Sequence, residues 1–114
     1  MSQLDQLRKG STKLLVLDVI GNDAKYGYQI MRELEEKSEG YFSLTAASLY
    51  PALHQLEEDG LVKSEWQSGQ GKRRRKYYTL TEAGQQALVD HLSEWRHFFN
   101  KLFDTLNLGM ESVS

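Results

Sequence analysis

The sequence predicts a mainly α-helical fold with one β-hairpin and a long C-terminal helix. Apolar residues recur at helical spacing in four separate segments, while residues 61–80 are instead rich in aromatic and β-branched side chains. The last helical segment keeps its apolar period for nearly three heptads. With 114 residues and a mass of 13.1 kDa, the chain has the length of one small domain.

Three helices are predicted in the first half of the chain. The first covers about residues 4–20 and stops at the turn-forming residues 21–23, and the second covers about residues 27–38. The third follows Thr45, a good N-cap, and stops at Gly60. Pro51 lies inside this third helix, so we expect a bend or a loosening of its first turns.

The second half is predicted to contain a hairpin, a helix and a tail. Strands at residues 61–66 and 76–80 flank a polar, glycine-containing and basic stretch, which is typical of a hairpin with a charged tip. We therefore expect a first unit at residues 1–80, a long helix at 81–108 and a short tail at 109–114.

The long helix carries an apolar stripe that predicts a homodimer. Its members are Leu88, Leu92, Trp95, Phe99, Leu102 and Leu106. A helix of this length extends about 40 Å, which is more than the rest of a small domain can cover. A second copy of the chain is the simplest partner for the uncovered stripe. The alternative is that this helix folds back over the first helix of its own chain.

The net charge of −2 is an average over two unlike parts. Taken alone, it argues against a nucleic-acid-binding protein, because such domains are typically basic. However, residues 72–76 are five consecutive basic residues, and outside them nine basic residues face 16 acidic ones, a net charge of −7. The hairpin tip therefore concentrates positive charge in an otherwise acidic protein.

Three helices followed by a basic hairpin are typical of a winged helix-turn-helix that binds double-stranded DNA. In that fold the third helix enters the major groove with its N-terminal part, and the hairpin tip reaches the backbone or the minor groove. The acidic residues of the third helix lie at its C-terminal end, as expected for a helix inserted by its N-terminus. The predicted DNA-binding residues are Thr45, Ala47, Tyr50, Pro51, His54, Lys72, Arg73, Arg74 and Arg75.

Two longer motifs resemble those of PadR-type transcriptional regulators. The segment SLYPALHQLE at residues 48–57 is similar to their recognition helix, and RRRKYYTLT at 73–81 is similar to their wing strand. Tyr26-Gly27-Tyr28 also fits, and the resemblance extends over about residues 10–107. It implies a homodimeric repressor that binds an inverted-repeat operator. Gln55 stands where many members carry arginine, so that phosphate contact is not carried over.

The region around Trp95 resembles the short, multidrug-sensing PadR members. In these, paired tryptophans from the two C-terminal helices flank a pore at the dimer interface, where planar aromatic compounds stack. The resemblance implies an effector site formed by Leu7, Leu14, His91, Trp95, Phe98 and Phe99. Because Phe99 stands where an acidic group can occur, a preference for cationic ligands has no electrostatic basis here. The alternative is that Trp95 is an ordinary core residue of the helix pair.

Several other classes of protein and site are not expected. The absence of cysteine excludes disulfides and thiolate sites, and His91 and His97 are six residues apart, which is not the spacing of metal ligands on one helical face. Residues 69–72 lack the spacing of a phosphate-binding loop. We therefore expect no enzyme, no cofactor and no metal. No apolar run is long enough for a membrane span, so a cytoplasmic protein is expected.

Two other functions remain open from the sequence. The winged helix could serve as a protein-interaction adaptor without sequence-specific DNA binding. It could also be a constitutive DNA-binding protein that responds to no effector.

Overall fold

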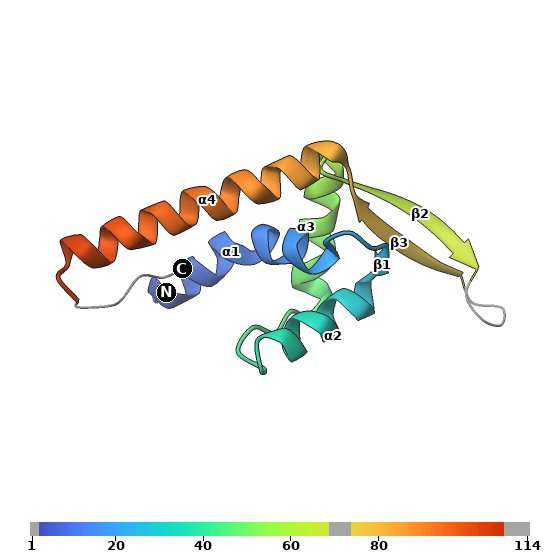
Figure 1. The fold of residues 1–114 in the computed structure, drawn as a ribbon. Coiled ribbons are helices and arrows are strands. Elements are labelled where there is room, and N and C mark those ends of the chain that lie inside the picture. Colours follow the sequence, from blue (N-terminus) through green and yellow to red (C-terminus); the bar gives the residue numbers. More distant parts are fainter. Residues whose placement is uncertain (1–2, 69–73, 109–114) are drawn as a thin grey trace.

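The computed structural model describes residues 3–68 and 74–108, and within these it contains four helices and three strands (Figure 1). The elements are α1 (Gln3–Ile20), β1 (Lys25–Tyr26), α2 (Gly27–Lys37), α3 (Ala46–Glu58), β2 (Val62–Ser68), β3 (Arg74–Leu80) and α4 (Glu82–Thr105). Their order and the long last helix confirm the predicted winged helix-turn-helix. We call β2 and β3 the wing and α3 the recognition helix.

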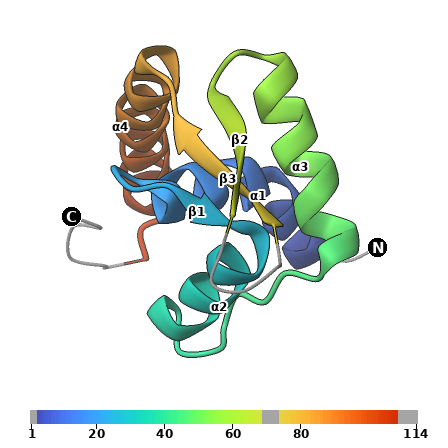
Figure 2. The ribbon, with the colours of Figure 1, turned by 90° about the vertical axis from the view of Figure 1, so that its right-hand side faces the viewer.

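The hydrophobic core lies where α1, α2 and α3 meet the sheet. Figure 2 shows α3 on one side of the sheet and α4 on the other, and contacts of α3 with β2 and of α4 with β3 agree with this view. The core consists of Val16, Leu17, Val19, Ile20, Ile30, Leu34, Leu49, Leu53, Leu56, Val62, Tyr78 and Leu80. The apolar positions at helical spacing in α3 are thus the buried ones, as amphipathic periodicity requires.

The sheet has three antiparallel strands in the order β1-β3-β2. Val62 pairs with Leu80 at the base of the wing, and Lys25 pairs with Tyr78 on the other edge. The sequence analysis missed β1, because a strand of two residues is too short to show alternation. The two wing strands are also longer than predicted and extend to Ser68 and from Arg74.

The recognition helix begins as predicted at Thr45. The Thr45 hydroxyl accepts a hydrogen bond from the Ser48 N–H at 3.2 Å, which satisfies one free donor of the first turn. The expected loosening at Pro51 is wrong, because α3 is helical from Ala46 to Glu58 without interruption. Pro51 has no N–H, so one hydrogen bond of the helix is not made there.

The long helix α4 is shorter than predicted. It ends at Thr105 rather than at Leu108, and Leu106 is its C-cap. The Leu106 N–H still donates to the Leu102 carbonyl at 2.9 Å, while Asn107 has a positive φ of 55° that the helix cannot continue through. Among the described residues, no helix is long and apolar enough to cross a membrane.

The first turn of α4 is fixed to the corner between α3 and β2. The Thr81 hydroxyl donates to the Gly60 carbonyl at 2.6 Å, and the Thr81 N–H donates to the Leu61 carbonyl at 3.0 Å. A Cβ atom on Gly84 would lie 1.9 Å from the Leu61 carbonyl oxygen, so only glycine allows this approach. The direction of α4 is therefore tied to the recognition helix and the wing.

Candidate nucleic-acid interface

The outward face of the recognition helix is neutral over its first turns. Ala47, Pro51 and His54 are exposed, and Thr45 is exposed just before the helix. No acidic residue occurs between Glu39 and Glu57. This end of the helix therefore presents the positive end of its dipole without nearby carboxylates on the same segment.

Two acidic residues at the other end of α3, Glu58 and Asp59, have partners on the same helix. His54 Nε2 lies 2.6 Å from Glu58 Oε1, a contact that is an ion pair only when the imidazole is protonated. The Gln55 amide donates to Asp59 at 3.0 Å. These contacts hold the two carboxylates on the C-terminal turn of the helix.

Tyr50 lies on the side of α3 that faces α2 and the wing. A Cβ atom on Gly27 would lie 2.1 Å from the Tyr50 hydroxyl oxygen, so the tyrosine ring covers this glycine. The Tyr50 side chain remains 45% exposed. The predicted groove-facing residue thus also connects the recognition helix to the start of α2.

The arginines of the wing stack on aromatic rings. The Arg74 guanidinium lies 5.6 Å from the centre of the Trp66 ring, and that of Arg75 lies 4.4 Å from the centre of the Tyr26 ring. Such cation–π contacts hold the planar group in place while its N–H donors remain available. Lys72 and Arg73, the other two predicted wing residues, fall outside the described residues.

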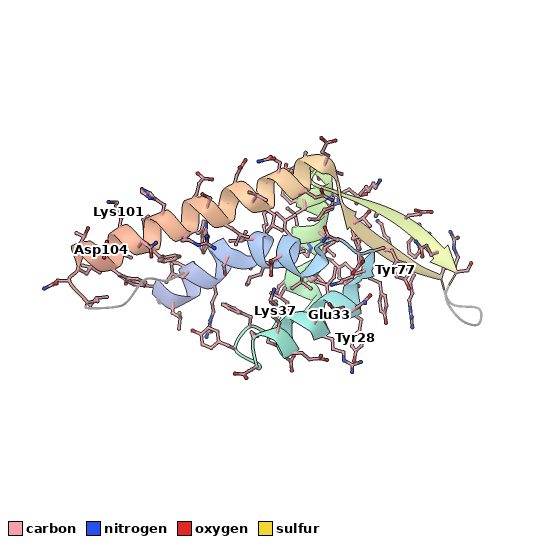
Figure 3. The ribbon with its side chains drawn as sticks, in the orientation of Figure 1. Tyr28, Glu33, Lys37, Tyr77, Lys101 and Asp104 are labelled. Carbon is pink, nitrogen blue, oxygen red and sulfur yellow. The ribbon has the colours of Figure 1, made fainter. Side chains whose placement is uncertain are left out.

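A cavity of about 810 Å³ lies between the wing, the start of α2 and the recognition helix. It is lined by Tyr26, Gly27, Tyr28, Tyr50, Trp66, Arg74, Arg75, Lys76 and Tyr78. Figure 3 shows Tyr28 on α2 and Tyr77 on β3 at this end of the molecule, with Lys101 and Asp104 at the far end of α4. Of this lining, the sequence analysis predicted only Tyr50, Arg74 and Arg75 as DNA-binding residues, although it had noted the Tyr26-Gly27-Tyr28 motif.

Tyr78 forms the floor between the cavity and the core. Burial raises the pKa of the Tyr78 hydroxyl above its ordinary value, and the nearby Glu57 and Tyr50 raise it further. The phenol therefore keeps its proton, and no negative charge arises from it beside the arginines.

The predicted effector residues lie at the other end of the molecule, on the neighbouring helices α1 and α4. Leu7, His91 and Phe98 are exposed, while Leu14, Trp95 and Phe99 are half-buried. The Trp95 and Phe99 rings meet edge to face at 5.7 Å, and the Phe99 ring stacks on that of Phe103 at 6.0 Å. Within the single chain these rings form an aromatic cluster on α4.

The predicted dimerisation stripe is partly covered by its own chain. Leu88 packs against the core, and Trp95, Phe99 and Leu102 are half-buried. Other large apolar side chains on or just after α4 are exposed, at 40% for Leu92, 56% for Leu106, 59% for Phe98 and 61% for Val89. α4 therefore leaves an apolar surface uncovered.

Comparison with known proteins agrees with this geometry. Residues 16–90 match the model of the transcriptional regulator PadR-like family. A transcriptional regulator of Mycobacterium tuberculosis, Rv3488, is 33% identical over 85 residues, which cover 75% of this chain and 76% of that protein.

Solved structures are similar as well. A PadR family regulator from Eggerthella lenta superposes with a TM-score of 0.80 at 31% identity, over 90% of this chain and 88% of the other. Bacillus subtilis PadR in complex with operator DNA has a TM-score of 0.64 at 29% identity, and the match covers 70% of this chain and 45% of that longer chain. These relatives are transcriptional regulators rather than enzymes, and the chain belongs to the PadR-like family of transcriptional regulators.

Proposed function

We propose that this regulator is a repressor that binds an inverted-repeat operator as a homodimer and is released by a planar aromatic ligand. The complex of B. subtilis PadR with operator DNA supports the DNA-binding part of the proposal. In this proposal Thr45, Ala47, Pro51 and His54 face the major groove. Tyr50 borders the groove, and Lys72, Arg73, Arg74 and Arg75 contact phosphates or the minor groove.

The observation that carries the proposal is the position of the wing arginines beside a neutral helix face. Arg74 and Arg75 line the same cavity as Tyr50 of the recognition helix. A duplex that takes the first turns of α3 into its major groove brings a phosphate backbone close to this cavity. Guanidinium groups held on aromatic rings suit such contacts, because they need little further ordering on binding.

The wing contacts are tested by the salt dependence of DNA binding. Arg74→Ala combined with Arg75→Ala removes two charges from each protomer, so the slope of log K against log salt should fall by about two units per bound protomer. Arg96→Ala with Lys101→Ala on α4 removes the same charge elsewhere and should leave the slope nearly unchanged. An unchanged slope in the wing variant contradicts the proposal. A wild-type protein without salt-dependent affinity for DNA would instead be an adaptor.

The uncovered apolar surface of α4 supports the proposed homodimer. Two copies joined along α4 bury Leu92 and Phe98, whose exposure a single chain does not explain. Because the first turn of α4 is fixed to α3 and the wing, the dimer sets the distance between the two recognition helices. Half-sites about 10 base pairs apart, one turn of DNA, are the expected spacing.

The effector site is proposed between the Trp95 side chains of the two copies. A planar ligand stacks on an indole ring through its face, and Trp95 already has Phe99 against it. Ligand binding changes the separation of the two α4 helices and thereby that of the wings, which favours the dimer arrangement that does not fit DNA. Without an effector response, the protein is a constitutive DNA-binding regulator.

Tryptophan fluorescence distinguishes a ligand-responsive regulator from a constitutive one, because the chain has only two tryptophans. In a Trp66→Phe variant, a neutral planar dye should quench the remaining Trp95 emission and weaken DNA binding. In a Trp95→Phe variant, quenching should be lost while DNA affinity is kept. Equal quenching of both variants contradicts the effector site.

A further inference from the structure

A second basic surface lies on α1, outside the predicted wing. Arg8, Lys9 and Lys13 are all exposed. They line a groove of about 590 Å³ together with Tyr41 from the loop before α3 and Ser48 from the first turn of α3. No acidic residue occurs between Asp5 and Asp18, so this stretch of α1 carries only positive charge.

This groove lies on the side of the recognition helix that is opposite to the wing. Tyr50 covers Gly27 beside the wing, and Glu57 accepts a hydrogen bond at 2.6 Å from Ser64 of β2. Ser48 and Ala52 instead line the groove shared with α1. The exposed face with Ala47 lies between these two sides, so the recognition helix has a basic surface on each flank.

The cations of α1 are exposed and take no part in the ion pairs of the described side chains. The Arg8 guanidinium lies 5.3 Å from the centre of the Tyr41 ring, an arrangement like those of the wing arginines. The ion pairs formed by the described side chains use Lys25, Arg32, Lys37 and His54 and none of these three cations. Lys9 and Lys13 are four residues apart and share one face of the helix.

The dimensions of B-DNA indicate what this surface binds. The major groove is about 12 Å wide and is bounded by the phosphates of both strands. A helix with its side chains is about 10–12 Å across and fills that width, so groups on its two flanks lie over different strands. We propose that Arg8, Lys9 and Lys13 bind phosphates of the strand across the major groove from the strand that the wing contacts. This inference rests on the proposed insertion of α3 into the groove.

The contact should be independent of the base sequence, because phosphates carry no sequence information. The contact also increases the number of cations that bind DNA: up to three per protomer come from α1, in addition to those of the wing. The acidic character of the rest of the chain then matters less for DNA binding, since both basic surfaces adjoin the same helix.

The test combines salt dependence with the mapping of phosphate contacts. In Lys9→Ala with Lys13→Ala, the slope of log K against log salt should fall by about two units per bound protomer, on every duplex tested. The matched control is Arg96→Ala with Lys101→Ala on α4, which should leave the slope nearly unchanged. Circular dichroism melting and sedimentation of all variants exclude loss of folding or self-association as the cause.

Phosphate ethylation interference assigns the strands. The α1 variant should lose interference on one strand of each half-site, and Arg74→Ala with Arg75→Ala should lose it on the other. Arg8→Ala should weaken binding, and Arg8→Lys should restore the charge contact but not the stacking on Tyr41.

If the wild type binds DNA with salt dependence while the α1 variant keeps the full slope and interference pattern, the inference on α1 is wrong and the proposed function stands. If the wild type shows no salt-dependent binding, the proposed function itself fails.

Discussion

The two ends of this molecule differ in how well a single chain covers its own apolar side chains. At the end with the recognition helix and the wing, the core residues are 0–8% exposed. Along the outer part of α1 and α4, Leu7, Phe98 and Leu106 are each more than half exposed. The first end therefore contains the hydrophobic core of the chain, whereas the second leaves an apolar surface that the proposed second copy would cover.

The two ends also differ in the chemistry they expose. The first combines a neutral helix face with arginines stacked on Trp66 and Tyr26. The second exposes aromatic and aliphatic side chains. Under the proposed function, this difference corresponds to a division of work in which one end contacts nucleic acid and the other contacts a second copy and a flat ligand. The predictions below test that division, beginning with the point where the two ends join.

The largest effect is expected at Gly84, which joins α4 to the α3–β2 corner. A Gly84→Ala side chain would overlap the Leu61 carbonyl oxygen, which belongs to the backbone and cannot move aside alone. The free energy of unfolding should fall by about 3 kcal/mol, in the range of overpacking. Urea unfolding measures this loss. Gly10→Ala in α1 meets nothing within 4 Å and should stabilise by about 0.5–1 kcal/mol. If the two substitutions changed the free energy of unfolding equally, the close contact of Gly84 with Leu61 would not hold α4 in place.

The next effect is expected at the uncovered surface of α4. Leu92→Lys should weaken self-association by about 30-fold, close to 2 kcal/mol, because a dimer would have to bury a charge from each copy. Sedimentation equilibrium gives the dissociation constant. Ser93→Lys adds the same side chain one position further, on another side of the helix, and should have little effect. If Ser93→Lys also separates the copies, the interface lies on a different face of α4.

A smaller effect is expected at the cap of the recognition helix. Thr45→Ala removes the acceptor of the Ser48 N–H and should lower the free energy of unfolding by about 1 kcal/mol. Ser43→Ala, an exposed position in the preceding loop, is the control and should change it little. Self-association should be unaffected in both variants, because the cap lies at the end that contains the hydrophobic core.

The smallest effect is expected at Tyr78 and appears only in alkali. Its pKa is raised by burial, so the folded protein keeps the proton that the unfolded chain releases near the ordinary tyrosine pKa of about 10. Stability is therefore complete below that pH and decreases as the pH rises towards the raised pKa. Tyr78→Phe should show a weaker decrease between about pH 9 and pH 11 than the wild type. Tyr28→Phe, at a position 61% exposed, should behave like the wild type.

The sequence predicted the first end well because its signals are local. The cap at Thr45, the helical spacing of Leu49, Leu53 and Leu56, and the glycine at 60 all act within a few residues. The same locality explains the misses. The two-residue strand β1 exists only through its pairing with β3, and the contact of Tyr50 with Gly27 joins positions 23 residues apart.

The candidate site was predicted only in part for a similar reason. A run of basic residues at 72–76 is visible in one segment, so the wing was found. Arg8, Lys9 and Lys13 are distant in sequence from the recognition helix, and only the packing of α1 on α3 brings them beside Ser48. The end of α4 was placed three residues too far because Gly109 is the first glycine after the apolar stripe, whereas the backbone already leaves the helix before Asn107, which has a positive φ.

The division between the two ends is tested most directly by the stoichiometry of the DNA complex. The operator is first selected from random duplexes, and sedimentation then counts the protomers bound to it by the wild type and by Leu92→Lys. We expect two protomers per operator for the wild type, with half-sites about one helical turn apart. We expect single protomers for the variant, with weak but still salt-dependent binding. One wild-type protomer per operator, or an unchanged affinity and count in the variant, would contradict the account.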